Sequence, residues 1–214
     1  MMIYNDKKSV LENVRVNGRL LRSASDELRN DKFVVLEAVK NNGEALQFAS
    51  DNLKNDKEIV LEAVKQDGYS VRYASETLRD DKEVAFATIE SEPYALDSMS
   101  ERLQNDMEVV LATVTKSGMA LRSVSDEKKN NYEVVSCAMK EFPLALYHAS
   151  KELQDNKEFL VLLRDSKVKK DNVIKIWFSE RMQKLREIEI LEDDDWMREN
   201  VASMNSKSVR PKKF

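Results

Sequence analysis

The nine residues DKEIVLEAV, from Asp56 to Val64, repeat the nine residues DKFVVLEAV, from Asp31 to Val39, at a distance of 25 residues. Looser copies of this motif begin at Asp6, Asp81, Asp106 and Asn131. Six copies therefore run from Asp6 to Asp155 without an insertion. An internal period of this length predicts an array in which each repeat packs mainly against its neighbours. We number the positions of each repeat from 1, beginning at these six residues.

Two further repeat positions recur along the chain. The four glycines of the sequence all occupy position 13, where the other two copies have proline: Gly18, Gly43, Gly68, Pro93, Gly118 and Pro143. Position 20 is always serine: Ser25, Ser50, Ser75, Ser100, Ser125 and Ser150. We expect the glycines to end a helix with a positive φ, and the two prolines to begin the next helix at its first position.

Each repeat is expected to form two helices and a capped turn. Asp56 is a good N-cap for a first helix of about ten residues, in which Val60, Ala63 and Val64 make an apolar stripe. A short second helix is expected over residues 45–49 and its copies. The serine then caps a single turn, for which a 3₁₀ helix is suggested, and this turn places a leucine, such as Leu53, in the core. Lys128 replaces this leucine in the fifth copy, which should pack less well there.

The composition agrees with a helical fold. Charged residues make up 35% of the 214-residue chain, and it contains only four glycines and three prolines, too few for the turns of an all-β protein. We predict an all-α, right-handed α-solenoid of six two-helix repeats in residues 1–166. Residues 167–204 are expected to form capping helices that cover the last repeat, although a partner-binding helix is the alternative. The basic residues 205–214 are expected to be disordered.

The motif Asp-Lys-Glu-Val-Val-Leu-x-Ala-Val, followed by Gly and then Ala-Leu-x-x-Ala-Ser-x-x-Leu, resembles an uncharacterised helical-repeat family. In that family, a domain of unknown function, one unit of about fifty residues covers two of these copies. The resemblance extends from Asp6 to about Leu163 and departs at Met107, Asn131 and Tyr132. It implies a helical repeat protein and supplies no catalytic residues.

The sequence contains no pattern typical of an enzyme. Phosphate-binding and nucleophile-elbow glycine motifs are absent, and one cysteine and one histidine cannot form a Cys/His metal site. A pair of Cys137 and His148 is conceivable, but structural roles are the favoured interpretation because no third residue is placed to orient the histidine. We therefore expect a non-enzymatic protein with no cofactor and no metal.

Positions 17 and 18 should align as two rows on the surface of the array. Arginine and aromatic residues, which are enriched at protein interfaces, recur there and at Tyr69. We predict that the partner-binding residues are Arg22, Gln47, Phe48, Tyr69, Arg72, Tyr73 and Arg122. In the alternative interpretation, the three arginines bind acids or carbonyls of the adjacent repeat and hold the stack together.

The expected partner is a protein or peptide. Nucleic-acid binding is the second hypothesis, because helical repeats can bind single-stranded RNA, but the formal net charge of −4 and Asp97 in the row count against it. No apolar run is long enough to span a membrane. The first twenty residues do not resemble a signal peptide, so a cytoplasmic location is expected, with the nucleus possible because of the basic tail.

Overall fold

The computed structural model describes residues 5–156 and residue 159, and the first compact unit, which ends at Leu153, contains the repeats up to that residue. Each repeat forms three helices: a long α-helix, a six-residue 3₁₀ helix and a short α-helix. The long α-helices are Lys7–Val16 (α1), Lys32–Asn41 (α3), Lys57–Gln66 (α5), Lys82–Ser91 (α7), Met107–Lys116 (α9) and Tyr132–Glu141 (α11). The predicted all-α repeat array is confirmed.

The second and third helices of each repeat are short. The 3₁₀ helices are Gly18–Ser23 (η1), Gly43–Phe48 (η2), Gly68–Tyr73 (η3), Pro93–Ser98 (η4), Gly118–Ser123 (η5) and Pro143–His148 (η6). The short α-helices are Asp26–Arg29 (α2), Asp51–Lys54 (α4), Glu76–Arg79 (α6), Glu101–Gln104 (α8), Asp126–Lys129 (α10) and Lys151–Asp155 (α12).

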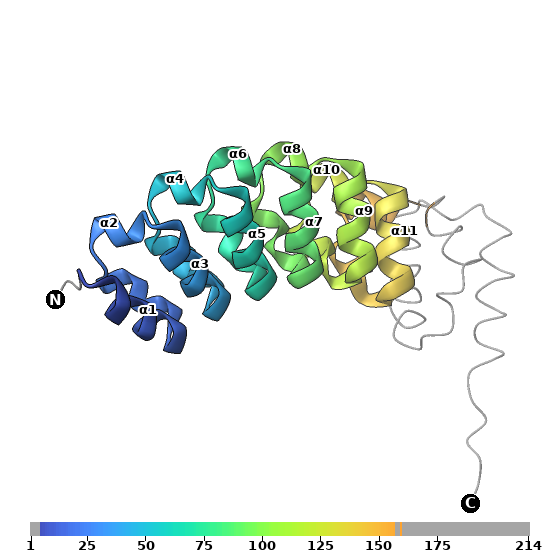
Figure 1. The fold of residues 1–214 in the computed structure, drawn as a ribbon. Helices are drawn as coiled ribbons and strands as arrows, with labels where there is room; N and C mark the ends of the chain where they lie inside the picture. The colour runs from blue at the N-terminus through green and yellow to red at the C-terminus, as the bar shows by residue number, and fades with distance from the viewer. Residues whose placement is uncertain (1–4, 157–158, 160–214) are drawn as a thin grey trace, which may run out of the picture. The chain divides into compact units, whose positions relative to one another are not determined.

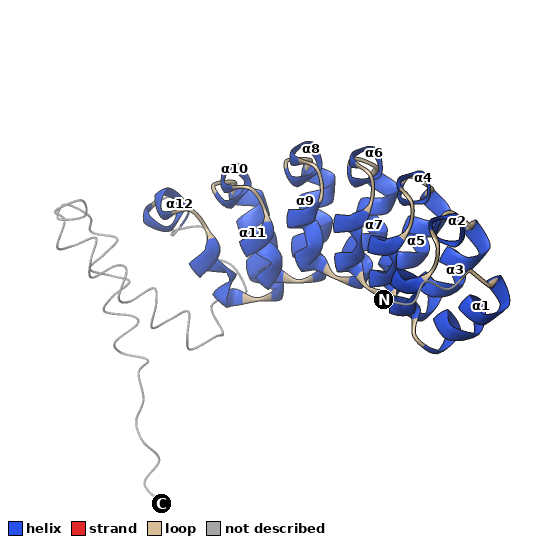
Figure 2. Cartoon of the chain, turned by 90° about the vertical axis from the view of Figure 1, so that its left-hand side faces the viewer, coloured by secondary structure: helices blue, strands red, loops and turns tan. Residues whose placement is uncertain are grey.

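Equivalent helices of successive repeats lie side by side and form three rows. The long α-helices pack against one another, as do the 3₁₀ helices, and α2 to α10 follow one edge of the array (Figure 1; Figure 2). The core lies between the rows and contains the apolar stripe of each long helix, such as Val60 and Val64 of α5. Ala45 and Leu46 of η2 are buried as well. Stability therefore comes from interfaces between repeats.

The first repeat is built as the end of the array. Positions 4 and 8 of α1 hold Ser9 and Asn13, where the later copies have buried residues such as Val34 and Ala38. Val10 and Val14, at positions 5 and 9 of the same helix, are buried. α1 therefore buries fewer residues than α3, as the helix of a terminal repeat does.

The 3₁₀ helix lies at the second helix of each repeat and not, as suggested, at the serine-capped turn. The second helix is a 3₁₀ helix that begins at the glycine, and the Asn42 side chain caps it by accepting a hydrogen bond from the Glu44 amide. The serine-capped turn is α-helical, since Ser50 accepts from the Leu53 amide and Leu53 is buried as expected. The expectation for Lys128 is confirmed, because α10 contributes no buried residue.

The expected reason for the glycines is also wrong. None of the four has a φ in the left-handed region, so the backbone itself does not require glycine. A Cβ atom at Gly43 would instead overlap the carbonyl oxygen of Ala63 in the next repeat and lie 2.7 Å from Oγ of Ser70. Glycine is thus used for close approach between repeats. Pro93 and Pro143 begin η4 and η6 at their first positions, as predicted.

The predicted capping helices (167–204) and basic tail (205–214) lie outside the described residues, and so does the end of the predicted repeat domain. Among the described residues, the structure contains no helix with the length and apolar composition needed to span a bilayer.

The close approach at position 13 can be tested with Gly43→Ala. The added methyl group overlaps backbone of the next repeat, so we expect a loss of about 1–3 kcal/mol in the free energy of unfolding, measured by urea denaturation. Gln66→Ala, at an exposed position of α5, is the control and should change stability by less than about 0.5 kcal/mol. Equal stability of both variants would contradict the packing role of Gly43.

Candidate interaction surface

The 3₁₀ helices carry a continuous strip of side chains at positions 14 and 17. Residues three apart lie above one another on a 3₁₀ helix, so the two positions share one face of each helix. We call this set the η strip. Its residues from the first five repeats are Arg19, Arg22, Glu44, Gln47, Tyr69, Arg72, Tyr94, Asp97, Met119 and Arg122. Its arginines and Asp97 are exposed, and the other members are half-buried.

Polar contacts join neighbouring repeats within the η strip. The Arg72 guanidinium donates to Oε1 of Glu44 in the preceding repeat at 3.1 Å. Nη1 of Arg19 lies 3.4 Å from the other oxygen of Glu44. Glu44 of the second repeat is therefore shared by arginines of the first and third repeats. A position-17 side chain thus reaches the position-14 side chain of the repeat before it.

Two arginines of the strip also contact aromatic rings, one between repeats and one within η3. The Arg122 guanidinium lies 4.5 Å from the ring centre of Tyr94 in the preceding repeat, and Arg72 lies 4.9 Å from the ring centre of Tyr73. Both distances are suitable for cation–π attraction. Partial burial, followed by the nearby charges of Glu92 and Asp97, raises the pKa of the Tyr69 hydroxyl. The Tyr69 hydroxyl is therefore uncharged at neutral pH.

The structure brings the predicted residues into neighbouring rows. Arg22, Arg72 and Arg122 are exposed, whereas Gln47 and Tyr69 are half-buried. Phe48 and Tyr73, at position 18, are also half-buried. Arg72 binds an acid of the adjacent repeat, as the stacking alternative requires, whereas Arg122 contacts a tyrosine ring there. Both arginines remain accessible, as partner binding requires.

Sequence reasoning missed Arg19, Glu44 and Tyr94. The signal that identifies them is the three-residue spacing of a 3₁₀ helix, which becomes useful only after the helix type is known. The Gln47 side chain, by contrast, donates to the Glu44 carbonyl within its own helix.

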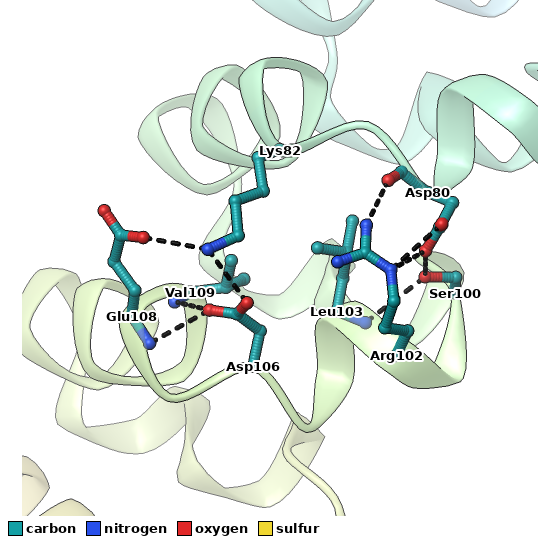
Figure 3. Close-up of polar contacts among 8 residues, drawn as sticks. All are labelled: Asp80, Lys82, Ser100, Arg102, Leu103, Asp106, Glu108 and Val109. Carbon is teal, nitrogen blue, oxygen red and sulfur yellow. Dashed lines mark hydrogen bonds and ion pairs between the residues drawn. The ribbon is translucent and has the colours of Figure 1, made fainter.

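A ladder of ion pairs fixes the first five long helices in register. Position 2 is lysine in the first four repeats, and each lysine reaches the position-1 aspartate of the next repeat. In Figure 3, Nζ of Lys82 lies 2.9 Å from both Asp106 and Glu108. Asp106 simultaneously accepts hydrogen bonds from the amides of its own helix, including that of Val109. One carboxylate thus caps a helix and joins two repeats.

These contacts shift the pKa values of both partners. Partial burial alone would raise the pKa of the Asp56 carboxyl, but hydrogen bonds from Lys32 and from two helix amides outweigh burial and lower the pKa. The pKa values of Asp31, Asp81 and Asp106 are lowered as well. Hydrogen bonds to Asp56 and Glu58 raise the pKa of Lys32. The charged forms are therefore favoured in the folded protein.

A second ladder connects the short helices. Oγ of Ser75 accepts from the Leu78 amide of its own helix and donates to Asn55 of the preceding repeat at 2.6 Å. Ser50, Ser125 and Ser150 make equivalent pairs of bonds. In Figure 3, Ser100 donates a hydrogen bond to Asp80, and Nε of Arg102 donates to Oδ1 of the same carboxylate at 2.9 Å. Position 20 therefore requires a group that can donate and accept at once.

The structure gives neighbours for both residues considered for chemistry, Cys137 and His148. Sγ of Cys137 lies 3.1 Å from Oγ1 of Thr115, a contact between repeats. Partial burial, and then the charges of Arg122 and Lys129, lower the pKa of His148. Among the described residues, no group of three or more His, Cys, Asp or Glu side chains is placed to hold a metal ion.

Comparison with known proteins agrees with the repeat. The family model described as a domain of unknown function (DUF4116) matches residues 6–49, 31–79 and 81–127, together more than half of the chain. The chain belongs to this family. Its overlapping matches begin 25 residues apart at 6 and 31, which is the period of the sequence. No curated protein and no solved structure matches the chain.

The double role of position 20 predicts the effect of Ser75→Ala. The variant loses the cap of α6 and leaves Asn55 without its donor, so the free energy of unfolding should fall by about 1–2 kcal/mol in urea denaturation. The matched control is Ser98→Ala, since Ser98 donates only to its neighbour Asp97, at 3.2 Å. An equally small effect of both variants would contradict the role of the serine ladder.

The lowered pKa of Asp56 predicts a pH-dependent effect of Asp56→Asn. Asparagine can still cap a helix, as Asn131 does, but it cannot pair with Lys32. A carboxyl whose pKa is lowered on folding stabilises the protein above its unfolded pKa of about 3.9, and this stabilisation is lost as the pH falls through the folded pKa.

We therefore expect Asp56→Asn to be less stable than the wild type at neutral pH, and the difference to vanish in acid. Urea denaturation of both proteins over a series of pH values from about 7 to 2 measures this difference. Glu76→Gln, at an exposed position of α6, serves as the control for loss of a carboxylate. A difference that stays constant or grows in acid would contradict the contribution of the ion pair.

Proposed function

We propose that the protein is a non-enzymatic scaffold that binds a protein or peptide partner through the η strip. The observation that supports this function is the arrangement of exposed arginines and half-buried tyrosines along successive 3₁₀ helices. Tyrosine and arginine are enriched at binding hot spots. Repeat arrays commonly bind partners through such continuous surfaces, because one partner can contact several repeats.

The two ladders support this proposal physically. The ion pairs join the long helices of adjacent repeats, and the serine bonds join their short helices. These contacts fix the distance between repeats, so the η strip is pre-organised. A pre-organised surface loses little conformational entropy on binding. The Arg72 contacts with Glu44 and Tyr73 have the same consequence for the strip itself, because they hold a long side chain in place before a partner arrives.

A photo-crosslinking experiment tests this function. A benzophenone amino acid replaces Tyr69 or Gln47 in the η strip of the full chain, and the protein is irradiated in native lysate with and without nuclease. We expect a discrete protein adduct from both positions that survives nuclease and decreases when Arg72→Ala is added. Mass spectrometry identifies the adduct and the peptide that carries the crosslink.

The control places the same amino acid at Lys65, an exposed residue at the end of α5. If the Lys65 position gives adducts in the same yield as the η-strip positions, proteins of the lysate bind the chain nonspecifically and the strip is not the binding site. Adducts that disappear with nuclease would favour nucleic-acid binding, and that outcome would replace the present proposal.

A further inference from the structure

The η strip is most cationic at its beginning. Arg19 and Arg22 lie on the same face of η1, and Arg19 and Arg72 share the single carboxylate of Glu44. Three arginines thus accompany one glutamate in the first three repeats. The whole chain carries a formal net charge of −4, so the positive charge of the strip in these repeats is opposite in sign to the net charge of the protein. The excess positive charge favours a ligand with carboxylate groups here.

The character of the strip changes along the array. Tyr69 and Tyr94 occupy position 14 in the third and fourth repeats, and Met119 follows in the fifth. Arg122 lies against the ring of Tyr94, and the Tyr94 hydroxyl lies 3.5 Å from Oγ of Ser117. This part of the surface suits aromatic or aliphatic side chains, which bury area against tyrosine and methionine.

We propose that the occupant of the η strip is an extended peptide with carboxylate side chains at one end and aromatic or aliphatic side chains about six residues away. The spacing follows from the packing, since two repeats at about 10 Å each span about 20 Å. An extended chain covers this distance in about six residues at roughly 3.3 Å per residue. This inference rests on the proposed function and specifies its ligand.

The acids of the strip itself favour a peptide over RNA. Glu44 lies among the arginines of the first three repeats, and Asp97 follows in the fourth. A nucleic acid places a phosphate at every nucleotide and would meet this negative charge, whereas a peptide can place its carboxylates only beside the arginines.

The test selects ligands without assuming their sequence. A phage library of random dodecapeptides is panned on the full-length protein and counter-selected on Arg22→Glu, a variant at an exposed side chain of the terminal repeat. We expect enriched peptides to carry aspartate or glutamate about six residues from Trp, Tyr, Phe or Leu. A synthetic peptide from this set should bind at least about tenfold more weakly to Arg22→Glu in fluorescence anisotropy. Lys65→Glu should bind it like the wild type, and Arg22→Lys should recover part of the loss.

The outcomes separate this inference from the proposed function. The inference of an acidic ligand is overturned if the enriched peptides carry no excess of acids, or if they bind Arg22→Glu as well as the wild type. If such peptides still depend on Tyr69, the proposed function of the strip in peptide binding remains. Failure to enrich any peptide, together with binding of a single-stranded RNA dodecamer that weakens steeply with salt, would overturn both proposals.

Discussion

The caps that begin the helices are shared between adjacent repeats, and the order of the array depends on this sharing. Asp56 accepts amides of its own helix with one carboxylate oxygen and binds Lys32 of the preceding repeat with the other. Ser75 likewise serves α6 and Asn55. A repeat of 25 residues cannot bury its apolar face alone, so its helices form only where a neighbour is present. A shared cap both begins a helix and fixes the register of the adjacent repeat, so helix formation and stacking depend on the same residue.

The ion-pair ladder is interrupted between the fifth and sixth repeats, and the cap is kept there. Position 2 of the fifth repeat is Met107, and position 1 of the sixth is Asn131, so the cation and the carboxylate that would face each other are both absent. Asn131 still caps α11 through the Val134 amide. The junction keeps the serine ladder through Ser150, which donates to Asn130 at 2.5 Å. The joint loss avoids an unpaired charge at the interface, while capping, which a neutral amide can perform, is retained.

The period, the aspartate and serine caps, the prolines at the start of η4 and η6 and the weak packing at Lys128 could all be predicted from the sequence, since each rests on local chemistry. The role of Gly43 could not, because the contact that excludes a Cβ atom comes from Ala63, twenty residues away in another repeat. The second bond of each serine was missed for the same reason. The η strip was predicted in part: its position-17 residues follow from the period, but position 14 joins them only through 3₁₀ geometry.

The variation among the repeats separates the positions that build the array from those available for binding. Position 20 is serine in every copy, whereas position 14 of the first five is Arg19, Glu44, Tyr69, Tyr94 and Met119 in turn. The serine caps are alike because each one also binds the preceding repeat. Contacts along the η strip differ between junctions, an ion pair at Arg72 and a ring contact at Arg122, so its side chains can differ from repeat to repeat within one stack. Under the proposed function, this freedom is what a regular array needs to recognise a partner whose own sequence does not repeat.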